Sequence, residues 1–98
     1  MISIKLYRQG RELVVAACDA DIIGQTFRSN DLKIHVSEGF YRGDSGDEDM
    51  LVNRLEMATI VNLVGRKTVD IAIRHGFVDP DCVLMIGGVP HAQMARMI

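Results

Sequence analysis

The stretch ISIKLYRQGRELVVAAC, residues 2–18, decides the fold class. Its first part alternates the apolar residues Ile2, Ile4 and Leu6 with more polar neighbours, which is the period of a strand with one buried face. The glycine in RQGRE supplies a turn, and the mostly apolar residues 12–18 predict a second strand. Because a turn this short joins antiparallel strands, the chain is expected to open with a β-hairpin.

Two short elements are expected next. Asp19 or Asp21 can cap a single helical turn, which Gly24 can end. Residues 32–36 alternate apolar and polar side chains and predict a third strand.

Two helices are expected in the second half of the chain. Ser45 followed by Glu48 is a capping-box pattern, so the first helix should begin there. It should continue through residues 57–65, MATIVNLVG, because a segment that is apolar nearly all round is typical of a buried helix. Gly65 should end or kink this helix, and residues 66–75 should form the second helix before a helix stop at HGF.

Thr59, Asn62 and Arg66 interrupt these apolar residues at spacings of three and four, so they should share one helix face. An unpaired amide in the core would cost about 1–3 kcal/mol. Asn62 is therefore expected either to hydrogen-bond a neighbouring loop or to face a ligand.

The end of the chain completes the predicted fold. Residues 82–86 form a continuous apolar strand, and residues 91–97 can form a final edge strand. Strands and long helices do not alternate strictly, which favours α+β over a doubly wound fold. We expect a single α+β domain over residues 1–98, with a mixed or antiparallel sheet of four to five strands and two main helices packed on one face.

Composition excludes several classes of function. The net charge of −2 gives no global attraction to nucleic acid, and aromatic residues are only 5% of the chain, which leaves few platforms for base stacking. No apolar run is long enough for a signal peptide or a membrane span, so a cytoplasmic protein is expected. Cys18 and Cys82 should be reduced, buried thiols.

The spacing of His and Cys matches no metal motif, and the chain lacks the glycine motifs of nucleotide sites, so no metal or cofactor is expected.

The segment MIGGVPHAQM, residues 85–94, is the first candidate site. Its glycines permit a sharp bend or a close backbone approach, and histidine titrates near neutral pH. One interpretation is a Gly-Gly turn or bulge followed by a proline at a sheet edge. The other is a binding site that also uses Asn62 and Arg66. Its candidate binding residues are Asn62, Arg66, Gly87, Gly88, Pro90, His91 and Gln93.

The segments FYRG, ATIVNLVG, VDIAIRHGFVDP and IGGVPHAQ together resemble the small archaeal family catalogued as domain of unknown function 424. The resemblance covers nearly the whole chain. It implies a single-domain, cytosolic, archaeal protein, and it suggests work beside the translation or RNA-processing machinery. It implies no role for any residue, because the family carries no established activity.

The preferred hypothesis is a non-catalytic binding module for RNA or a protein of the translation machinery. Amide side chains offer donors and acceptors, and arginine offers a fork for phosphate or carboxylate. One alternative is a small enzyme that uses His91 as a general acid or base. The other is a self-associating protein, a homodimer through the C-terminal edge strand at residues 91–97.

Overall fold

The computed structural model describes residues 1–96. The strands are β1 (Ile2–Gln9), β2 (Glu12–Asp19), β3 (Thr26–Ser29), β4 (Leu32–His35), β5 (Asp44–Gly46), β6 (Ile60–Val64), β7 (Leu84–Ile86) and β8 (Val89–Ala95). The α-helices are α1 (Glu38–Tyr41), α2 (Glu48–Met57) and α3 (Arg66–Arg74), and 3-10 turns cover Ala20–Ile22 and Pro80–Cys82. This is a mixed α+β fold.

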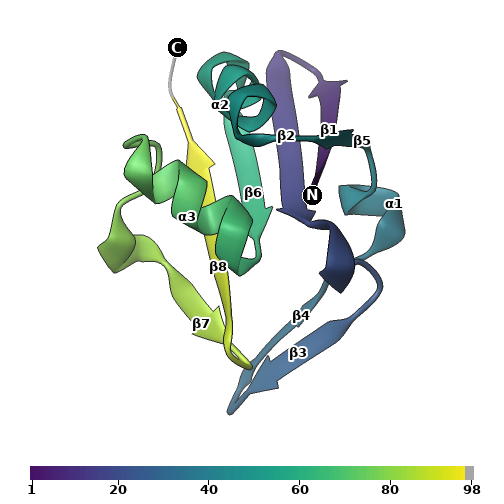
Figure 1. Cartoon of the computed structure of the whole chain (residues 1–98), viewed down its shortest axis with the longest axis vertical. Helices are drawn as coiled ribbons and strands as arrows, with labels where there is room; N and C mark the ends of the chain where they lie inside the picture. The colour runs from purple at the N-terminus through teal and green to yellow at the C-terminus, as the bar shows by residue number, and fades with distance from the viewer. Residues whose placement is uncertain (97–98) are drawn as a thin grey trace.

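The main sheet has six strands in the order β5-β1-β2-β6-β8-β7 (Figure 1). The first three of these come from the first half of the chain and the last three from the second half. The two halves meet at β2 and β6, which form a parallel pair, whereas the other neighbouring strands of this sheet are antiparallel. The sheet is therefore mixed, and it is larger than the four to five strands expected from the sequence.

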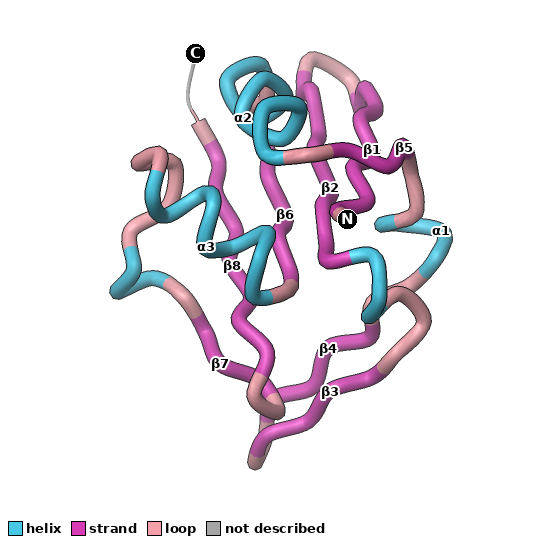
Figure 2. Tube along the Cα trace, viewed as in Figure 1, coloured by secondary structure: helices cyan, strands magenta, loops and turns pink. Residues whose placement is uncertain are grey.

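The β1–β2 hairpin agrees with the prediction, with Ile2 opposite Asp19 and Gln9 opposite Glu12. Strands β3 and β4 form a separate hairpin that lies below the main sheet in Figure 2. Only β4 was expected. Asn30, in the turn between them, has a φ of 51°, a conformation that asparagine tolerates better than most residues.

The prediction of a helix through residues 57–65 is wrong in its second part. Helix α2 ends at Met57, and Ile60–Val64 is strand β6 at the centre of the sheet. Strand β6 carries Val61 and Leu63 on one face and Ile60 and Val64 on the other, so its sequence shows nearly the same pattern as a buried helix. Three of its five residues are β-branched, which favours the strand.

Two further predictions about the helices are also wrong. Thr59, Asn62 and Arg66 do not share a helix face. Thr59 precedes strand β6, Asn62 lies within it, and Arg66 begins α3. Helix α2, the first of the two predicted helices, begins after Asp47, whose Oδ1 accepts a hydrogen bond of 3.0 Å from the amide of Met50. Ser45 lies instead in β5, beside β1.

Two strand boundaries near the C-terminus also differ from the prediction. Cys82 lies in a 3-10 turn, and β7 begins at Leu84. The final strand, β8, lies between β6 and β7 rather than at the edge of the sheet. Residues 92–95 have a strand partner only on the β6 side, so the predicted edge is present only along that stretch. Met97, which the prediction included, lies outside the described residues.

Helices α2 and α3 cover one face of the sheet, called here the helical face (Figure 1). Leu51 and Leu55 of α2 and Val69 and Ala72 of α3 are buried there. They share one apolar cluster with alternate residues of the four central strands, among them Ile4, Val15, Leu63 and Ala92. Burial of this area is the main stabilising contribution of the fold.

The opposite face of the sheet is called here the open face, because only part of it is covered. Helix α1 and the β3–β4 hairpin close its lower part over a second apolar cluster, which contains Ala16, Cys18, Val36, Tyr41 and Val64. On the uncovered part of this face, the side chain of Asn62 in β6 is half-buried and that of Gln93 in β8 is exposed. This part of the sheet is therefore accessible to a partner.

None of the helices within residues 1–96 is long and apolar enough to cross a membrane.

Candidate functional site

Asn62 and Gln93 stand side by side on the open face. They are paired across β6 and β8, and Nε2 of Gln93 donates a hydrogen bond of 2.8 Å to Oδ1 of Asn62. This bond uses one donor of Gln93, while the Asn62 amide nitrogen still offers two donors and the Gln93 oxygen an acceptor. The pair lines a shallow hollow of about 300 Å³, with Ile60 and Ala95 beside it. Two candidate residues from distant segments therefore lie next to each other.

His91 lies on the same face as this amide pair, because residues two apart in a strand point to the same side. It is half-buried, and its Nδ1 lies 2.9 Å from the carbonyl oxygen of Leu63. A carbonyl only accepts, so Nδ1 carries the proton of this bond and Nε2 is the nitrogen that stays available. No carboxylate within the described chain hydrogen-bonds the ring, so His91 lacks the orienting acid of a typical catalytic base.

Gly87 and Gly88 form the two-residue turn between β7 and β8, which is the turn interpretation of the sequence. Their φ values of 58° and 81° are left-handed, as a tight hairpin of this kind requires. A Cβ on Gly87 would also lie 2.8 Å from the carbonyl oxygen of Arg28 in β3. The first glycine thus lets the turn pack against the second hairpin, and both glycines have structural reasons to be there.

Pro90 lies within β8, opposite Met85 of β7. Its carbonyl accepts a hydrogen bond of 3.0 Å from the amide of Gly65, just beyond the end of β6. The carbonyl of Gly65 is bonded to the amide of Val69 in α3. A residue with a backbone N–H at position 90 would face the carbonyl of Gly65, which is already bonded to Val69. A proline, which has no N–H, is therefore tolerated inside the sheet.

Arg66 lies on the helical face, away from the amide pair. Its Nη2 makes a long contact of 3.4 Å with the carbonyl oxygen of Gly88. It borders a groove together with residues of α3, β7 and Pro90. The predicted single surface is in fact two surfaces, with Asn62, His91 and Gln93 on the open face and Arg66 and Pro90 on the helical face.

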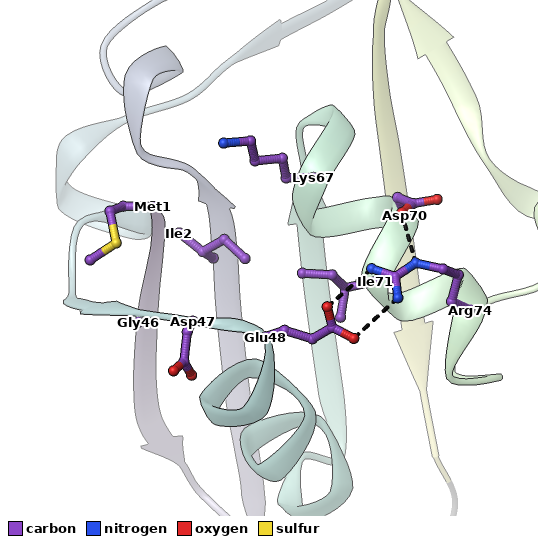
Figure 3. A pocket seen from close by; sticks show the side chains of 9 residues that line it. All are labelled: Met1, Ile2, Gly46, Asp47, Glu48, Lys67, Asp70, Ile71 and Arg74. Atoms are coloured by element: carbon purple, nitrogen blue, oxygen red, sulfur yellow. Dashed lines mark hydrogen bonds and ion pairs between the residues drawn. The ribbon is translucent and has the colours of Figure 1, made fainter.

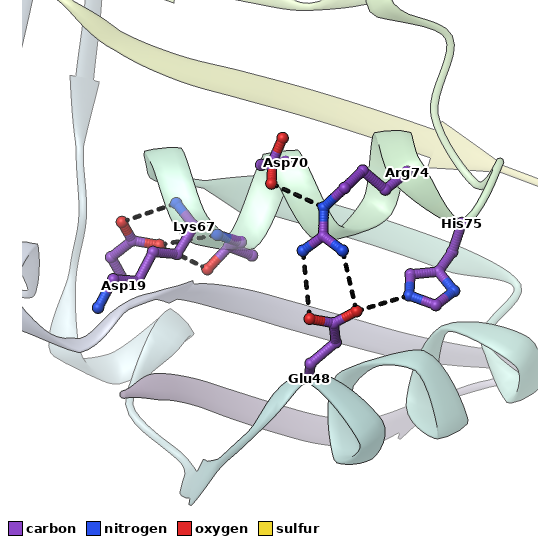
Figure 4. A network of polar contacts seen from close by, with 7 residues as sticks. Asp19, Glu48, Lys67, Asp70, Arg74 and His75 are labelled. Atoms are coloured by element: carbon purple, nitrogen blue, oxygen red, sulfur yellow. Dashed lines mark hydrogen bonds and ion pairs between the residues drawn. The ribbon is translucent and has the colours of Figure 1, made fainter.

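The start of α3 is occupied by the carboxylate of Asp19, which is the buried last residue of β2 (Figure 4). Oδ1 accepts from the amide and the hydroxyl of Thr68 at 2.9 and 2.8 Å, and Oδ2 accepts from the amide of Lys67 at 3.1 Å. Gly65 has a φ of 113°, and a Cβ there would lie 2.5 Å from Cγ of Asp19. The N–H groups that could bind a phosphate at this helix end are therefore already hydrogen-bonded to Asp19.

One feature of the sequence points to this cap. Gly65 stands directly before the helix, where a Ser, Thr, Asp or Asn often supplies the capping oxygen. Glycine has no side chain, so any side-chain cap of this helix must come from another part of the chain.

A second cavity, of about 340 Å³, lies between the starts of β1 and α2 and one side of α3, along which it extends from Lys67 to Arg74 (Figure 3). At its edge, both carboxylate oxygens of Glu48 accept from Arg74, at 3.1 and 3.2 Å, and Arg74 also bonds Asp70 at 2.9 Å. Nε2 of His75 lies 2.8 Å from Glu48. These four residues, which join α2 to α3, are called here the interhelical cluster (Figure 4).

The hydrogen bonds that Glu48 accepts from Arg74 and then His75 lower the pKa of Glu48, and those that Arg74 donates to Glu48 and Asp70 raise the pKa of Arg74. The charges of the cluster thus stabilise one another. This arrangement suits a link between two helices better than a ligand site.

The cysteines differ from the prediction in part. Cys18 is buried, and desolvation raises its thiol pKa to about 12, so it is a poor nucleophile. Cys82 is exposed, because it lies in a surface turn instead of an apolar strand. Among residues 1–96, no three side chains of His, Cys, Asp or Glu are grouped as metal ligands.

Both the sequence and the fold match known proteins. A family model described as "Protein of unknown function (DUF424)" matches residues 7–97. The crystal structure of an uncharacterized conserved protein from Methanopyrus kandleri is similar, with a TM-score of 0.80 and 26% sequence identity over 95% of this chain and 89% of that chain. No curated protein matches the sequence.

Proposed function

This chain belongs to the DUF424 family, and from its open face we propose that it is a non-catalytic binding module for single-stranded RNA. The observation that carries the proposal is the pair of amides, Asn62 and Gln93, held together in a hollow on the uncovered part of the open face. Amide side chains hydrogen-bond the edges of unpaired bases, which is how proteins read single-stranded RNA.

A cation and an aromatic ring on the same face support an RNA ligand. Lys5, Ala16, Asn62 and Gln93 occupy one row across four neighbouring strands. Tyr7 lies in the next row, and Nζ of Lys5 is 5.5 Å from the centre of its ring. Along this row the backbone of Lys5 lies two strand spacings, about 10 Å, from that of Asn62 and three spacings, about 14 Å, from that of Gln93. A lysine contacts phosphate, a ring stacks on a base, and the amides read base edges.

The charge of the chain limits this interaction to a small footprint. A net charge of −2 gives no long-range attraction to RNA, so affinity must come from the local contacts on the open face. Because few phosphates are contacted, we expect modest affinity that weakens only slightly as the salt concentration rises.

Fluorescence anisotropy with labelled oligoribonucleotides of about 12 nucleotides, the scale of known single-strand sites, tests the proposal. Replacing Asn62 or Gln93 with alanine should each weaken binding about tenfold, the loss of roughly one good base contact. Asn53→Ala is the matched control, because Asn53 is an exposed amide on α2. Absence of RNA binding by the wild-type protein, or equal binding by all three variants, would refute the proposal.

The enzyme hypothesis has less support. His91 faces the same side as Asn62, but its Nδ1 bonds a backbone carbonyl and the hollow is shallow. His91→Ala would have to abolish a detected reaction while leaving RNA binding in place for this hypothesis to gain ground.

Self-association is the other competing proposal. The observation that favours it is that residues 92–95 have a strand partner on one side only. Sedimentation equilibrium separates the cases, since a mass equal to one chain at all concentrations excludes pairing through this stretch.

A further inference from the structure

The groove beside Arg66 lies on the helical face, between α3 and the β7–β8 hairpin, and has a volume of about 490 Å³. Its walls are aliphatic: Val69 and Ile73 come from α3, Val83 and Met85 from the segment that includes β7, and Pro90 from β8. The side chain of Met85 is 55% exposed. The groove therefore presents apolar surface directly beside an edge of the sheet.

The edge itself has free backbone groups. Strand β7 is the last strand of the sheet, and Met85 is paired with Pro90. The carbonyl of Pro90 points away from β7, because it accepts from Gly65 on the other side. In an antiparallel pair the two opposite residues point their backbone groups either both inward or both outward. The N–H and C=O of Met85 therefore point outward, to the free side of β7.

A charged group stands at the rim of the groove. Arg66 is exposed, and its contact with Gly88 is a long 3.4 Å, so most donors of its guanidinium remain available. The nearest acid in the lining, Asp70, is bonded to Arg74 at 2.9 Å. Arg66 is thus free to pair with a carboxylate from another molecule.

We propose that this groove binds an extended peptide segment, which adds as a strand to the free edge of β7 and places a carboxylate on Arg66. Edge pairing supplies backbone hydrogen bonds, and alternate side chains of the peptide enter the pocket beside the strand. The lining contains no aromatic ring for base stacking, and its aliphatic walls fit aliphatic side chains. A peptide therefore suits this groove better than a nucleic acid does.

This inference is independent of RNA binding. The groove lies on the helical face, whereas Asn62 and Gln93 lie on the open face, so either activity can fail without the other. Arg66 was the anchor of the predicted single site, and here it anchors a second surface.

A phage library that displays random peptides with free carboxyl termini is the first probe. We expect selection on the wild-type protein to enrich peptides with alternating aliphatic residues and an acidic residue or terminal carboxylate, and selection on Arg66→Glu to lose them. A selected peptide is then synthesised and titrated while the amide signals of the protein are followed by NMR. The amides of Met85 and its neighbours in β7, together with those of α3, should shift.

Two variants test the mechanism with that peptide. Arg66→Ala should weaken binding by about tenfold or more, because a charged hydrogen bond is lost. Lys67→Ala is the matched control, since the neighbouring lysine lines a different cavity and should leave the affinity unchanged. Met85→Pro removes the outward N–H and should abolish binding while the amide spectrum remains that of a folded protein.

No enrichment over the Arg66→Glu selection would overturn the proposal. Shifts confined to the open face would overturn it as well, and so would equal binding by the wild-type, Arg66→Ala and Met85→Pro proteins.

Discussion

At the scale of single residues, Asp19 links two elements that are distant in sequence. It ends β2, and its carboxylate accepts three hydrogen bonds from the first turn of α3. The side chain is buried, so water does not replace these bonds when they are lost. The N-terminal end of a helix carries a partial positive charge, which also favours the negatively charged carboxylate of Asp19 at this position.

Replacing Asp19 with alanine should lower the free energy of unfolding by about 2–4 kcal/mol, which combines the loss of a helix cap with unsatisfied buried donors. Urea denaturation measures this as a lower midpoint with an unchanged slope. Asp21→Ala removes an exposed carboxylate from the adjoining 3-10 turn and should change stability by less than about 0.5 kcal/mol. Equal effects of the two substitutions would contradict the role assigned to Asp19.

Some predictions that depended only on local chemistry agree with the structure, although the capping box at Ser45 does not. The two-glycine turn is an example, because left-handed φ values and short hairpins select glycine directly. The grouping of Asn62 with Arg66 was wrong because it depended on the assumed helix, and a strand reverses the direction of alternate side chains. Only the register between β6 and β8, which no local pattern reveals, places Gln93 next to Asn62.

At the scale of elements, the interhelical cluster fixes α2 against α3. The carboxylate of Glu48, in the first turn of α2, receives Arg74 and His75 from the last turn of α3. These pairs are exposed, so each contributes little alone, and their shared geometry is what orients the two helices.

The cluster predicts how stability responds to acid. The bonds from Arg74 and His75 lower the pKa of Glu48 in the folded state below its usual 4.5. A depressed folded pKa stabilises the protein above the unfolded pKa, and this contribution is lost as the pH falls through the folded value. Thermal melts of the wild-type protein should therefore lose stability below about pH 4.5, and Glu48→Gln should flatten this decline.

Glu56→Gln is the control for this experiment, because it removes an exposed carboxylate of the same helix that lies outside the cluster. An acid profile of Glu48→Gln that matches the wild-type profile would show that the ion pairs do not stabilise the folded state.

At the scale of the whole molecule, the sequence predicted the class of fold but not the order of its strands. The opening hairpin, the second helix and the apolar strand near residue 85 followed from local periodicity. The parallel pairing of β2 with β6 joins residues 14–18 to residues 60–64, and such long-range partners leave no trace in a local pattern. The error in residues 57–65 has a different cause, because a strand with apolar residues on both faces, such as β6, hides its own period.

The order of strands also separates the two proposed surfaces. The amide pair on the open face and the groove on the helical face both use β8, because alternate residues of that strand point to opposite sides. One strand can therefore present a polar site and an apolar site at once.

The meeting of the two halves at β2 and β6 has a consequence for folding kinetics. Hairpins such as β1–β2 and β7–β8 are local and form within about 10 μs, whereas the central pair must close a long loop before its contacts stabilise anything. The rate-limiting step should therefore be the docking of two preassembled half-sheets. Stopped-flow refolding of Leu63→Ala, a variant in β6, should be slowed, while Ile86→Val in β7 should chiefly speed unfolding. The reverse pattern would mean that the outer hairpin, and not the centre of the sheet, nucleates the fold.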